Sequence, residues 1–324
     1  MGYLQDGVWT EDKDRTKGGQ FVRPNAVFRN WITPDGAAGP SGQGGFKAEP
    51  GRYHLYVSLA CPWAHRTVIF RKLKQLENVI SMSITSWHMG KDGWTFDQAE
   101  GSTGDAVNAK EKLSEIYLAA EPRYTGRVSV PVLWDKERKT IVNNESPEII
   151  RMLNSAFDES TNDRTDYYPP ALRAEIDRIN DIVYPNINNG VYRTGFASSQ
   201  EAYEKAFRSL FDALDEIEQI LSERRYLAGD KITEADWRLF PTLIRFDAVY
   251  YGHFKCNWRH VWEYPNIWNY TRELYQLPGI ADTVSLEHIK RHYYGSQRLV
   301  NPTGIVPLGP QLDFAAPHNR ARLG

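Results

Sequence analysis

The dipeptide Cys61-Pro62 ends an apolar and β-branched run, residues 55–60, and precedes a sequence with the character of a helix. Proline is favoured at the first helical position, because its missing N–H is not needed there. Cys61 is therefore expected just before a helix, where free backbone N–H groups and the positive end of the helix dipole favour the thiolate. The thiolate is the nucleophilic form of cysteine. An isolated cysteine is more commonly a small buried apolar residue, which is the alternative interpretation.

Position 64 limits the chemistry that this sulfur can carry out. A Cys-Pro-x-Cys redox pair would have its second cysteine there, and the chain has Ala64. If Cys61 forms a disulfide during turnover, an outside thiol must therefore resolve it. The other cysteine, Cys256, has no second ligand pair spaced for zinc. We expect it to be a buried or surface thiol, and we expect no metal.

Composition excludes several classes of function. The 324 residues are enough for two domains, each with its own core. Lys plus Arg is 39 and Asp plus Glu is 41, for a net charge of −2, which argues against nucleic-acid and polybasic membrane binding. No apolar run is long enough to span a bilayer, and the N-terminus lacks the features of a signal peptide. Two cysteines fit a reducing compartment. We expect a cytoplasmic protein with neither nucleic acid nor membrane as a partner.

The first half of the chain predicts a compact α/β domain over residues 51–157. An extended arm rich in Gly and Pro, residues 1–50, precedes it, and Phe21, Phe28 and Trp31 are candidates to pin that arm. The proline inside 128–134 suits an edge or the start of a strand. Ser146 is the expected N-cap of the last helix, with Pro147 in its first turn. The predicted elements are a strand at 53–58, a helix at 62–76, a strand at 79–85, an insertion at 86–125 with a helical piece at 109–119, strands at 128–134 and 141–143, and a helix from 146 to about 157.

The second half predicts helices only. Residues 158–169 form a polar linker, residues 170–300 an all-helical domain, and residues 301–324 a tail rich in Pro and Gly. Thr233 and Asp236 have the spacing of a capping box at a helix start. The order of elements in the first half is that of a thioredoxin-like domain, so the fold class is α/β followed by all-α. The predicted helices cover 170–188, 199–225, 233–251, 265–276 and 280–294.

These features together resemble the glutathione transferases. The chain is similar in particular to their Xi class, the glutathionyl-hydroquinone reductases, over nearly its whole length. The resemblance implies an N-terminal thioredoxin-like domain that binds glutathione and an all-helical C-terminal domain. It also implies glutathione as co-substrate, glutathionyl-hydroquinones as substrates, and a homodimer. Its motifs are Cys-Pro-Trp-Ala-His-Arg-Thr at 61–67, Asn-Glu-Ser-Pro-Glu-Ile-Ile-Arg at 144–151, Asn-Asn-Gly-Val-Tyr at 188–192 and Asn-Pro-Thr-Gly-Ile at 301–305.

The resemblance also implies a set of glutathione contacts. Pro131 is expected in the cis form, which in an X–Pro bond is rarely accidental. Glu145 and Ser146 are expected to hold the γ-glutamyl group, and this agrees with the chemistry: a hydroxyl and helix-start N–H groups suit a carboxylate, and a carboxylate suits an ammonium. The other implied contacts are Trp94, Arg127, Ser129, and Val128 and Val130, and the backbone groups of these two valines would pair with the cysteinyl part of glutathione.

Three of the 18 tyrosines acquire roles through the same resemblance. Tyr192 is implied as the proton donor near the quinone. Tyr250 and Tyr293 are implied as hydroxyls directed at the sulfur, because a hydrogen bond to the charged form lowers a pKa. Tyr294 adjoins Tyr293 and is the alternative for that position. His65, four residues beyond Cys61, is a weaker candidate for a general base.

The implied reaction starts with attack of the Cys61 thiolate on the glutathionyl sulfur of a glutathionyl-hydroquinone. A Cys61–glutathione mixed disulfide and a hydroquinone result, and a second glutathione then releases glutathione disulfide. Two alternatives remain open at this point. An omega-like thioltransferase, or deglutathionylase, would share Cys61 without needing Tyr192. A scaffold protein with the same fold would have an inert cysteine.

Overall fold

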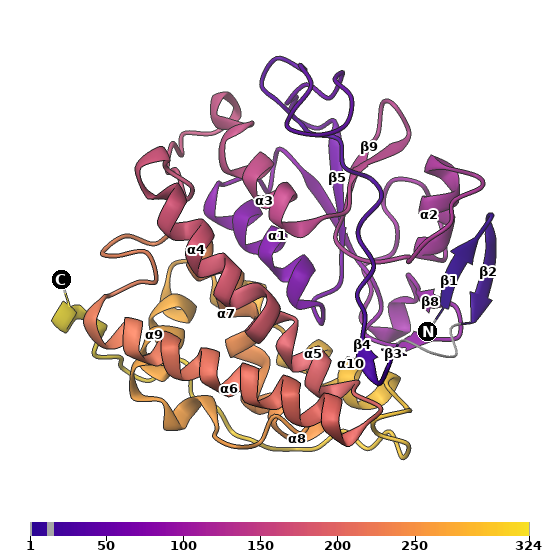
Figure 1. Ribbon diagram of the computed structural model, residues 1–324. Coiled ribbons are helices and arrows are strands. Elements are labelled where there is room, and N and C mark those ends of the chain that lie inside the picture. Colours follow the sequence, from indigo (N-terminus) through magenta and orange to yellow (C-terminus); the bar gives the residue numbers. More distant parts are fainter. Residues whose placement is uncertain (1, 12–15, 324) are drawn as a thin grey trace. The chain divides into compact units, whose positions relative to one another are not determined.

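The computed structural model describes residues 2–11 and 16–323, and they divide into two compact units (Figure 1). The first unit contains residues 2–11 and 24–165, and the second contains residues 16–23 and 166–323. The N-terminal arm is therefore divided, because its residues 16–23 fold with the helical half of the chain.

A four-stranded sheet with the order β10-β9-β5-β6 forms the centre of the first unit. β5 runs parallel to β6 and antiparallel to β9, which pairs antiparallel with β10. Every residue of β5 is buried, so this strand is covered on both faces. The sequence predicts all four strands, whose bounds are Tyr53–Val57 (β5), Ser81–Ile84 (β6), Val132–Asp135 (β9) and Thr140–Asn143 (β10).

Helices cover this sheet on its two sides. α1 (Pro62–Leu73) and α3 (Ser146–Ser155) contact each other on one side, and α2 (Leu113–Ala120) lies on the other (Figure 1). The β-α-β, insertion, β-β-α order matches the expected thioredoxin-like domain. β9 begins only after Pro131, which has no N–H to donate to a strand ladder. A short connection, residues 58–61, joins the buried β5 to the N-terminus of α1, and Cys61 is its last residue.

The start of α3 differs from the prediction that Ser146 is its N-cap. Glu145 occupies the N-cap, and Ser146 is the first residue of the helix. The Asn143 Oδ1 atom accepts the Glu145 N–H at 2.7 Å, and the Glu145 carbonyl accepts from the N–H groups of Glu148 and Ile149. The amide of Asn143 thus fixes the turn one residue earlier than the capping preference of serine indicates, because a side chain outside the helix supplies the bond.

Short strands form where the sequence predicts an extended arm and an irregular insertion. Small two-stranded sheets of this kind depend on what packs against them, because an isolated hairpin is marginal in water. Trp9 of β2, for example, donates its indole N–H to the Lys91 carbonyl at 2.8 Å. The pairs are β1 (Gly2–Gln5) with β2 (Val8–Glu11), β3 (Thr16–Lys17) with β4 (Gln20–Phe21), and β7 (Met89–Gly90) with β8 (Gly93–Trp94).

Residues 166–323 of the second unit are built from helices, as predicted, and two of these helices continue through π-helical segments. α4 passes into 184–188, and α7 passes into Phe246–Tyr250. The helix expected over 280–294 starts later, at Leu286, because the Ser285 hydroxyl accepts the His288 N–H and fixes the start there. The helices are α4 (Arg173–Val183), α5 (Gly190–Gly195), α6 (Gln200–Glu223), α7 (Glu234–Arg245), α8 (Tyr251–His253), α9 (Pro265–Gln276) and α10 (Leu286–Ser296).

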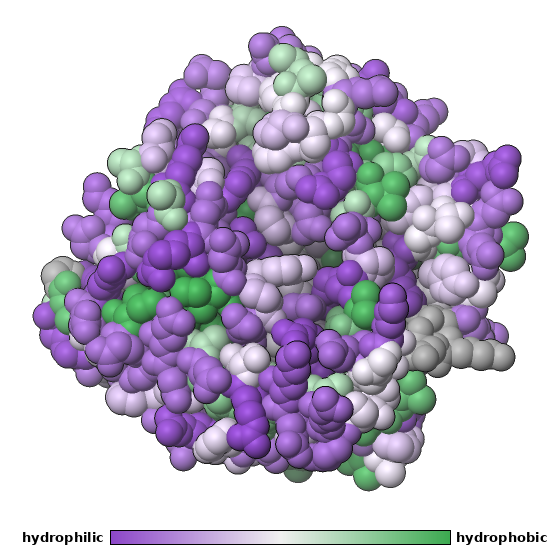
Figure 2. All heavy atoms as spheres, viewed as in Figure 1, coloured by the Kyte–Doolittle hydropathy of each residue, from purple (hydrophilic) through white to green (hydrophobic). Residues whose placement is uncertain are grey.

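The surface drawn in Figure 2 is mainly hydrophilic, with hydrophobic residues in separate small patches. Over residues 2–11 and 16–323, none of the helices has both the length and the apolar character that a bilayer crossing requires.

The predicted capping box at α7 gives a test of the helical unit. The buried Asp236 carboxylate accepts from the backbone N–H groups of Leu227 and Thr233 and from the Tyr270 hydroxyl. Asp236→Ala leaves these donors unpaired, and we expect the free energy of unfolding to fall by about 3 kcal/mol. Urea denaturation followed by circular dichroism measures the change. The exposed Asp230→Ala is the matched control, and a loss in Asp236→Ala no larger than in that control contradicts the expectation.

A second test uses the pH dependence of stability. His54 on β5 is fully buried, its Nδ1 lies 2.7 Å from the Ser81 hydroxyl, and burial lowers its pKa to about 4. In the unfolded chain His54 takes up a proton near pH 6.5, whereas in the folded chain it does so only near pH 4. The contribution of neutral His54 to the free energy of unfolding is therefore fully present above pH 6.5 and is lost as the pH falls toward 4. Between pH 7 and pH 5 we expect this histidine to lower the free energy of unfolding by about 2 kcal/mol. Urea denaturation of His54→Asn at both pH values should show a smaller loss than wild type, and an equal loss would exclude the effect.

Candidate functional site

Cys61 occupies the N-cap of α1, with Pro62 as the first helical residue, as the sequence predicts. Its backbone is extended (φ −78°, ψ 121°), its carbonyl accepts the first helical bond from the His65 N–H at 3.0 Å, and its side chain is half-buried. The sulfur therefore lies at the positive end of a helix and is reachable from solvent, which is the environment of a reactive cysteine.

The segment before β9 approaches this sulfur. The Cys61 thiol donates a weak hydrogen bond to the Val130 carbonyl at 3.6 Å, and the Val130–Pro131 peptide bond is cis, in agreement with the expectation. Since a thiolate has no proton to donate, this contact belongs to the protonated form. The structure thus brings together Cys61 and Val130, two of the predicted site residues.

A buried tyrosine connects this segment to the loop before α3. The Tyr117 hydroxyl of α2 donates to the Ser129 carbonyl at 2.8 Å and accepts from the Asn144 amide at 3.1 Å. Burial raises the pKa of Tyr117, so the hydroxyl keeps the proton that it donates. One side chain therefore holds both Ser129 and Asn144, the residue before Glu145. This fixes the position of Ser129 relative to Glu145, and both of these are predicted glutathione contacts.

Ser146, at the start of α3, is contacted by a buried cation. Arg66 of α1 is 1% exposed, and its Nη1 donates to the Ser146 Oγ at 3.3 Å. The Arg66 guanidinium also lies 4.7 Å from the Trp63 ring. Because Oγ accepts from Arg66, the hydroxyl proton of Ser146 is directed away from it and is available to an external acceptor. Glu145 next to it is half-buried.

The two remaining predicted contacts of this unit lie on the insertion. Trp94 is on β8 and is 5% exposed. Arg127 directly precedes Val128, and its guanidinium lies 5.6 Å from the ring of Tyr3. Both belong to the unit that contains Cys61. Their roles in binding remain predictions.

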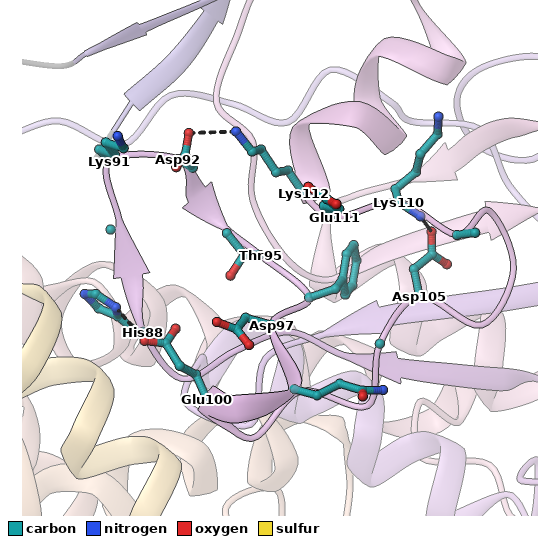
Figure 3. Close-up of a pocket in the computed structure, with 15 residues that line it drawn as sticks. His88, Lys91, Asp92, Thr95, Asp97, Glu100, Asp105, Lys110, Glu111 and Lys112 are labelled. Atoms are coloured by element: carbon teal, nitrogen blue, oxygen red, sulfur yellow. Dashed lines mark hydrogen bonds and ion pairs between the residues drawn. The ribbon is translucent and has the colours of Figure 1, made fainter.

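The insertion also lines an open pocket of about 820 Å³, drawn in Figure 3. Its lining has charged groups of both signs, and two pairs of them are in contact: Lys112 with Asp92 at 2.8 Å, and His88 with Glu100 at 2.9 Å. The Asp105 carboxylate accepts from the backbone N–H groups of residues 107, 108 and 110. These bonds shape the loop, and the pocket lining contains neither Cys61 nor any other predicted site residue.

The three tyrosines predicted in the second half form a connected group. The Tyr293 hydroxyl lies 2.5 Å from that of Tyr192 and 3.0 Å from that of Tyr250. Burial raises the pKa of Tyr250 and Tyr293 well above the usual value, which keeps both hydroxyls protonated at neutral pH. The Tyr294 hydroxyl is directed instead to the Ala248 carbonyl, at 3.5 Å. Within this unit, Tyr293 and not Tyr294 joins the group.

Cys256 is fully buried, as one of the two expected alternatives has it. Its thiol contacts the Phe254 carbonyl at 3.8 Å, and burial raises its pKa, so this sulfur stays a thiol. In the part of the chain that the structure describes, no three His, Cys, Asp or Glu side chains come together as a metal would require.

Sequence reasoning did not find the residues that hold the site in place. Tyr117 and Arg66 act through contacts with residues 12 to 80 positions away, and Asn143 acts through turn geometry, so no local pattern signals them. Arg66 has a weak signal, because its position one turn after the cysteine puts it on α1, but only the packing of α1 against α3 shows its partner.

Two family descriptions match the chain. "Glutathione S-transferase, N-terminal domain" matches residues 60–156, and "Glutathione S-transferase, C-terminal domain" matches residues 200–273. The first range includes Cys61 and the start of α3. The second includes Tyr250 of the tyrosine group.

Relatives match nearly the whole chain. The sequence is 54% identical to the glutathionyl-hydroquinone reductase YqjG of Escherichia coli over 99% of this chain and 98% of the relative. A glutathione-bound structure of YqjG superposes with a TM-score of 0.93 at 53% identity, covering 99% of both chains. A Xi-class transferase from Natrialba magadii gives a TM-score of 0.91 at 48% identity, covering 100% of this chain and 97% of the other. The chain therefore belongs to the Xi class of the glutathione transferases, the family of the glutathionyl-hydroquinone reductases.

Proposed function

We propose that this enzyme removes glutathione from glutathionyl-hydroquinones through a Cys61–glutathione mixed disulfide, with glutathione as its co-substrate. The observation that carries the proposal is the placement of Cys61 at the N-terminus of α1, beside Val130, with alanine where a resolving cysteine would stand. Support comes from YqjG, a glutathionyl-hydroquinone reductase whose sequence is 54% identical to this chain.

Glutathione would bind along the loops that Tyr117 and Arg66 hold. Its γ-glutamyl carboxylate would accept from the Ser146 hydroxyl and from N–H groups at the start of α3, and its ammonium would pair with Glu145. The backbone of Val128–Val130 would pair with the cysteinyl part, with Trp94 and Arg127 as further contacts. This orientation is supported by the Arg66–Ser146 bond, which leaves the serine proton available to a carboxylate.

In the first half-reaction the Cys61 thiolate attacks the sulfur of the thioether. An S–S bond forms, the C–S bond breaks, and its electron pair stays on the aromatic carbon. That carbon takes a proton, which we propose comes from the Tyr192 hydroxyl. The products are the hydroquinone and Cys61 in a mixed disulfide with glutathione. The carbon is reduced, and the two sulfurs are oxidised.

In the second half-reaction a glutathione thiolate attacks the glutathione sulfur of the mixed disulfide. Glutathione disulfide leaves, the Cys61 thiolate is regenerated, and the proton lost by this glutathione balances the one used before. Ala64 explains why the second thiol must come from outside the chain. Tyr250 and Tyr293, both protonated, would donate toward the sulfur and so lower its pKa.

We also propose that the protein is a cytoplasmic homodimer. Its glutathione-binding domain would cover residues 51–157 and its all-helical domain residues 170–300, with an arm at 1–50, a linker at 158–169 and a tail at 301–324. Two cysteines that form no disulfide support a reducing compartment, and the dimer follows from the family resemblance. Light scattering on the purified protein distinguishes a dimer from a monomer.

The mixed disulfide can be tested directly. Cys61→Ser should lower reductase turnover at least about a thousandfold, because a serine hydroxyl stays protonated and forms no disulfide. Intact-protein mass spectrometry after exposure to a glutathionyl-hydroquinone alone should show one added glutathione on wild type and none on Cys61→Ser. Cys256→Ser is the matched control and should keep both the turnover and the adduct. Full turnover in Cys61→Ser would exclude this mechanism.

The role of Tyr192 separates reduction from simple thiol transfer. Tyr192→Phe should lower turnover on a glutathionyl-hydroquinone about a hundredfold, because the carbon then lacks its acid. Turnover on a small glutathione mixed disulfide, in which no carbon is protonated, should stay within about twofold of wild type. Tyr203→Phe, on α6, is the matched control. Unchanged hydroquinone reduction in Tyr192→Phe would refute the donor role. A wild-type turnover that is far higher on the mixed disulfide than on the glutathionyl-hydroquinone would favour the omega-like thioltransferase.

A further inference from the structure

Residues 16–23 of the N-terminal arm form part of the helical unit. β3 and β4 pair as a hairpin, the Thr16 hydroxyl lies 3.1 Å from that of Ser198, and the Ser198 N–H donates to the Gly19 carbonyl at 3.0 Å. Gly19 has a φ of +77°, and a Cβ at this position would lie 2.4 Å from the Ser199 hydroxyl oxygen. The glycine therefore lets the hairpin fit closely against the turn between α5 and α6.

This attachment places two side chains against Tyr192. The Phe21 and Tyr192 rings are stacked, with centroids 6.3 Å apart and an interplanar angle of 28°. The Arg23 guanidinium carbon lies 5.0 Å from the centre of the Tyr192 ring. Arg23 Nε also donates to Asn189 Oδ1 at 3.0 Å, three residues before Tyr192 on the same stretch of chain. The cation is thus held over the ring by a second bond.

A cation over a phenol ring matters most when that phenol becomes an anion. A neutral ring attracts the cation through its quadrupole, and a phenolate attracts it in addition through its full negative charge, part of which lies on the ring. The Arg23–Tyr192 contact therefore becomes stronger when Tyr192 gives up its proton. An interaction that is stronger after proton transfer than before it favours the transfer.

We propose that Arg23 is a positioning residue for Tyr192, whose phenolate it stabilises as the proton passes to the aromatic carbon of the substrate. This inference rests on the proposed role of Tyr192 as proton donor. The proton leaves the Tyr192 oxygen, the carbon receives it together with the electron pair of the broken C–S bond, and the proton from the second glutathione restores the tyrosine. A segment of the arm, far from Cys61 in the sequence, would thereby tune the reaction.

Other polar groups around Tyr192 act in the same unit, and a pH test must take them into account. Tyr293 of α10 contacts the Tyr192 hydroxyl, and Tyr250 bonds to Tyr293. Both keep their protons, since burial raises the pKa of each. Among the described residues, further charged or titratable groups of this unit are Arg245 at the end of α7, and His253 and His292, whose rings contact Tyr293. Arg193, on α5 itself, donates to the Pro185 carbonyl. Burial lowers the pKa of His253 to about 4, so it is neutral at the pH of the test.

Arginine fits this position better than lysine. The planar guanidinium can cover a ring face and donate from Nε to Asn189 at the same time, whereas an ammonium is a compact point charge. A lysine should therefore keep part of the effect through its charge, and glutamine should lose it.

The experiment measures kcat/KM for a glutathionyl-hydroquinone against pH in wild type, Arg23→Gln and Arg23→Lys. Arg23→Gln should lower kcat/KM at pH 7 about tenfold and move the alkaline limb of the profile up by about one pH unit, because a Tyr192 without the cation is a weaker acid. For Arg23→Lys, both kcat/KM at pH 7 and the position of the alkaline limb should lie between those of wild type and Arg23→Gln. Ionisation of the substrate is common to all three proteins, so a difference in the limb reports on the enzyme. Turnover on a small mixed disulfide should stay within about twofold.

Two further variants make the result decisive. Arg173→Gln removes another guanidinium that lies over a tyrosine ring, 4.9 Å from that of Tyr168. This variant should change neither the pH profile of hydroquinone reduction nor the turnover on the mixed disulfide. Arg23→Gln placed in Tyr192→Phe should cause no further loss. If Tyr192→Phe reduces hydroquinones normally, both the donor role and the role of Arg23 are overturned. If Tyr192→Phe is impaired while Arg23→Gln keeps the wild-type rate and profile, or lowers both activities equally, only the role of Arg23 is overturned.

Discussion

The electrostatics of one helix start are the constraint on which the active site depends. α1 follows β5, a strand buried on both faces, so the position of its N-terminus is fixed by the core of the first unit. Cys61 is the last residue of the short connection between strand and helix, residues 58–61, and its sulfur lies where the backbone N–H groups of α1 have no helical partner. The same geometry that begins the helix favours the charged form of the sulfur. Reactivity here is a property of the connection between two elements.

The glutathione contacts proposed for the first unit depend on side chains that bind no ligand themselves. Tyr117 holds the segment before β9 to the loop before α3, and Arg66 holds α1 to the first residue of α3. Both are buried, so their bonds are protected from competition with water. A loop that binds a ligand needs such support, because regular secondary structure does not hold it in place. The buried bonds therefore keep the ligand-binding loops in one arrangement.

Local signals in the sequence predict the parts that are themselves local. The strand, cysteine, proline and helix around Cys61 follow from residue types within one stretch, and so does the capping box of Thr233 and Asp236. The prediction of the α3 N-cap is wrong by one residue, because Asn143, outside the helix, supplies the decisive hydrogen bond. The hairpins of the arm and the contact of Arg23 with Tyr192 join segments far apart in the chain. No pattern in either segment alone contains that information, and the tyrosine roles came from the family resemblance, since 18 tyrosines offer no chemical basis for choosing three.

The absence of a cysteine at position 64 links the structure to the direction of the chemistry. A local partner would trap Cys61 in an intramolecular disulfide and release the first glutathione without forming glutathione disulfide. With Ala64, the mixed disulfide persists until another thiol reaches it, so a site that already binds glutathione on one sulfur must also admit a second one. Cys256 cannot take this part, because it is fully buried and remains a thiol. Position 64 thus leaves an external thiol to resolve Cys61, which is half-buried where Cys256 is fully buried.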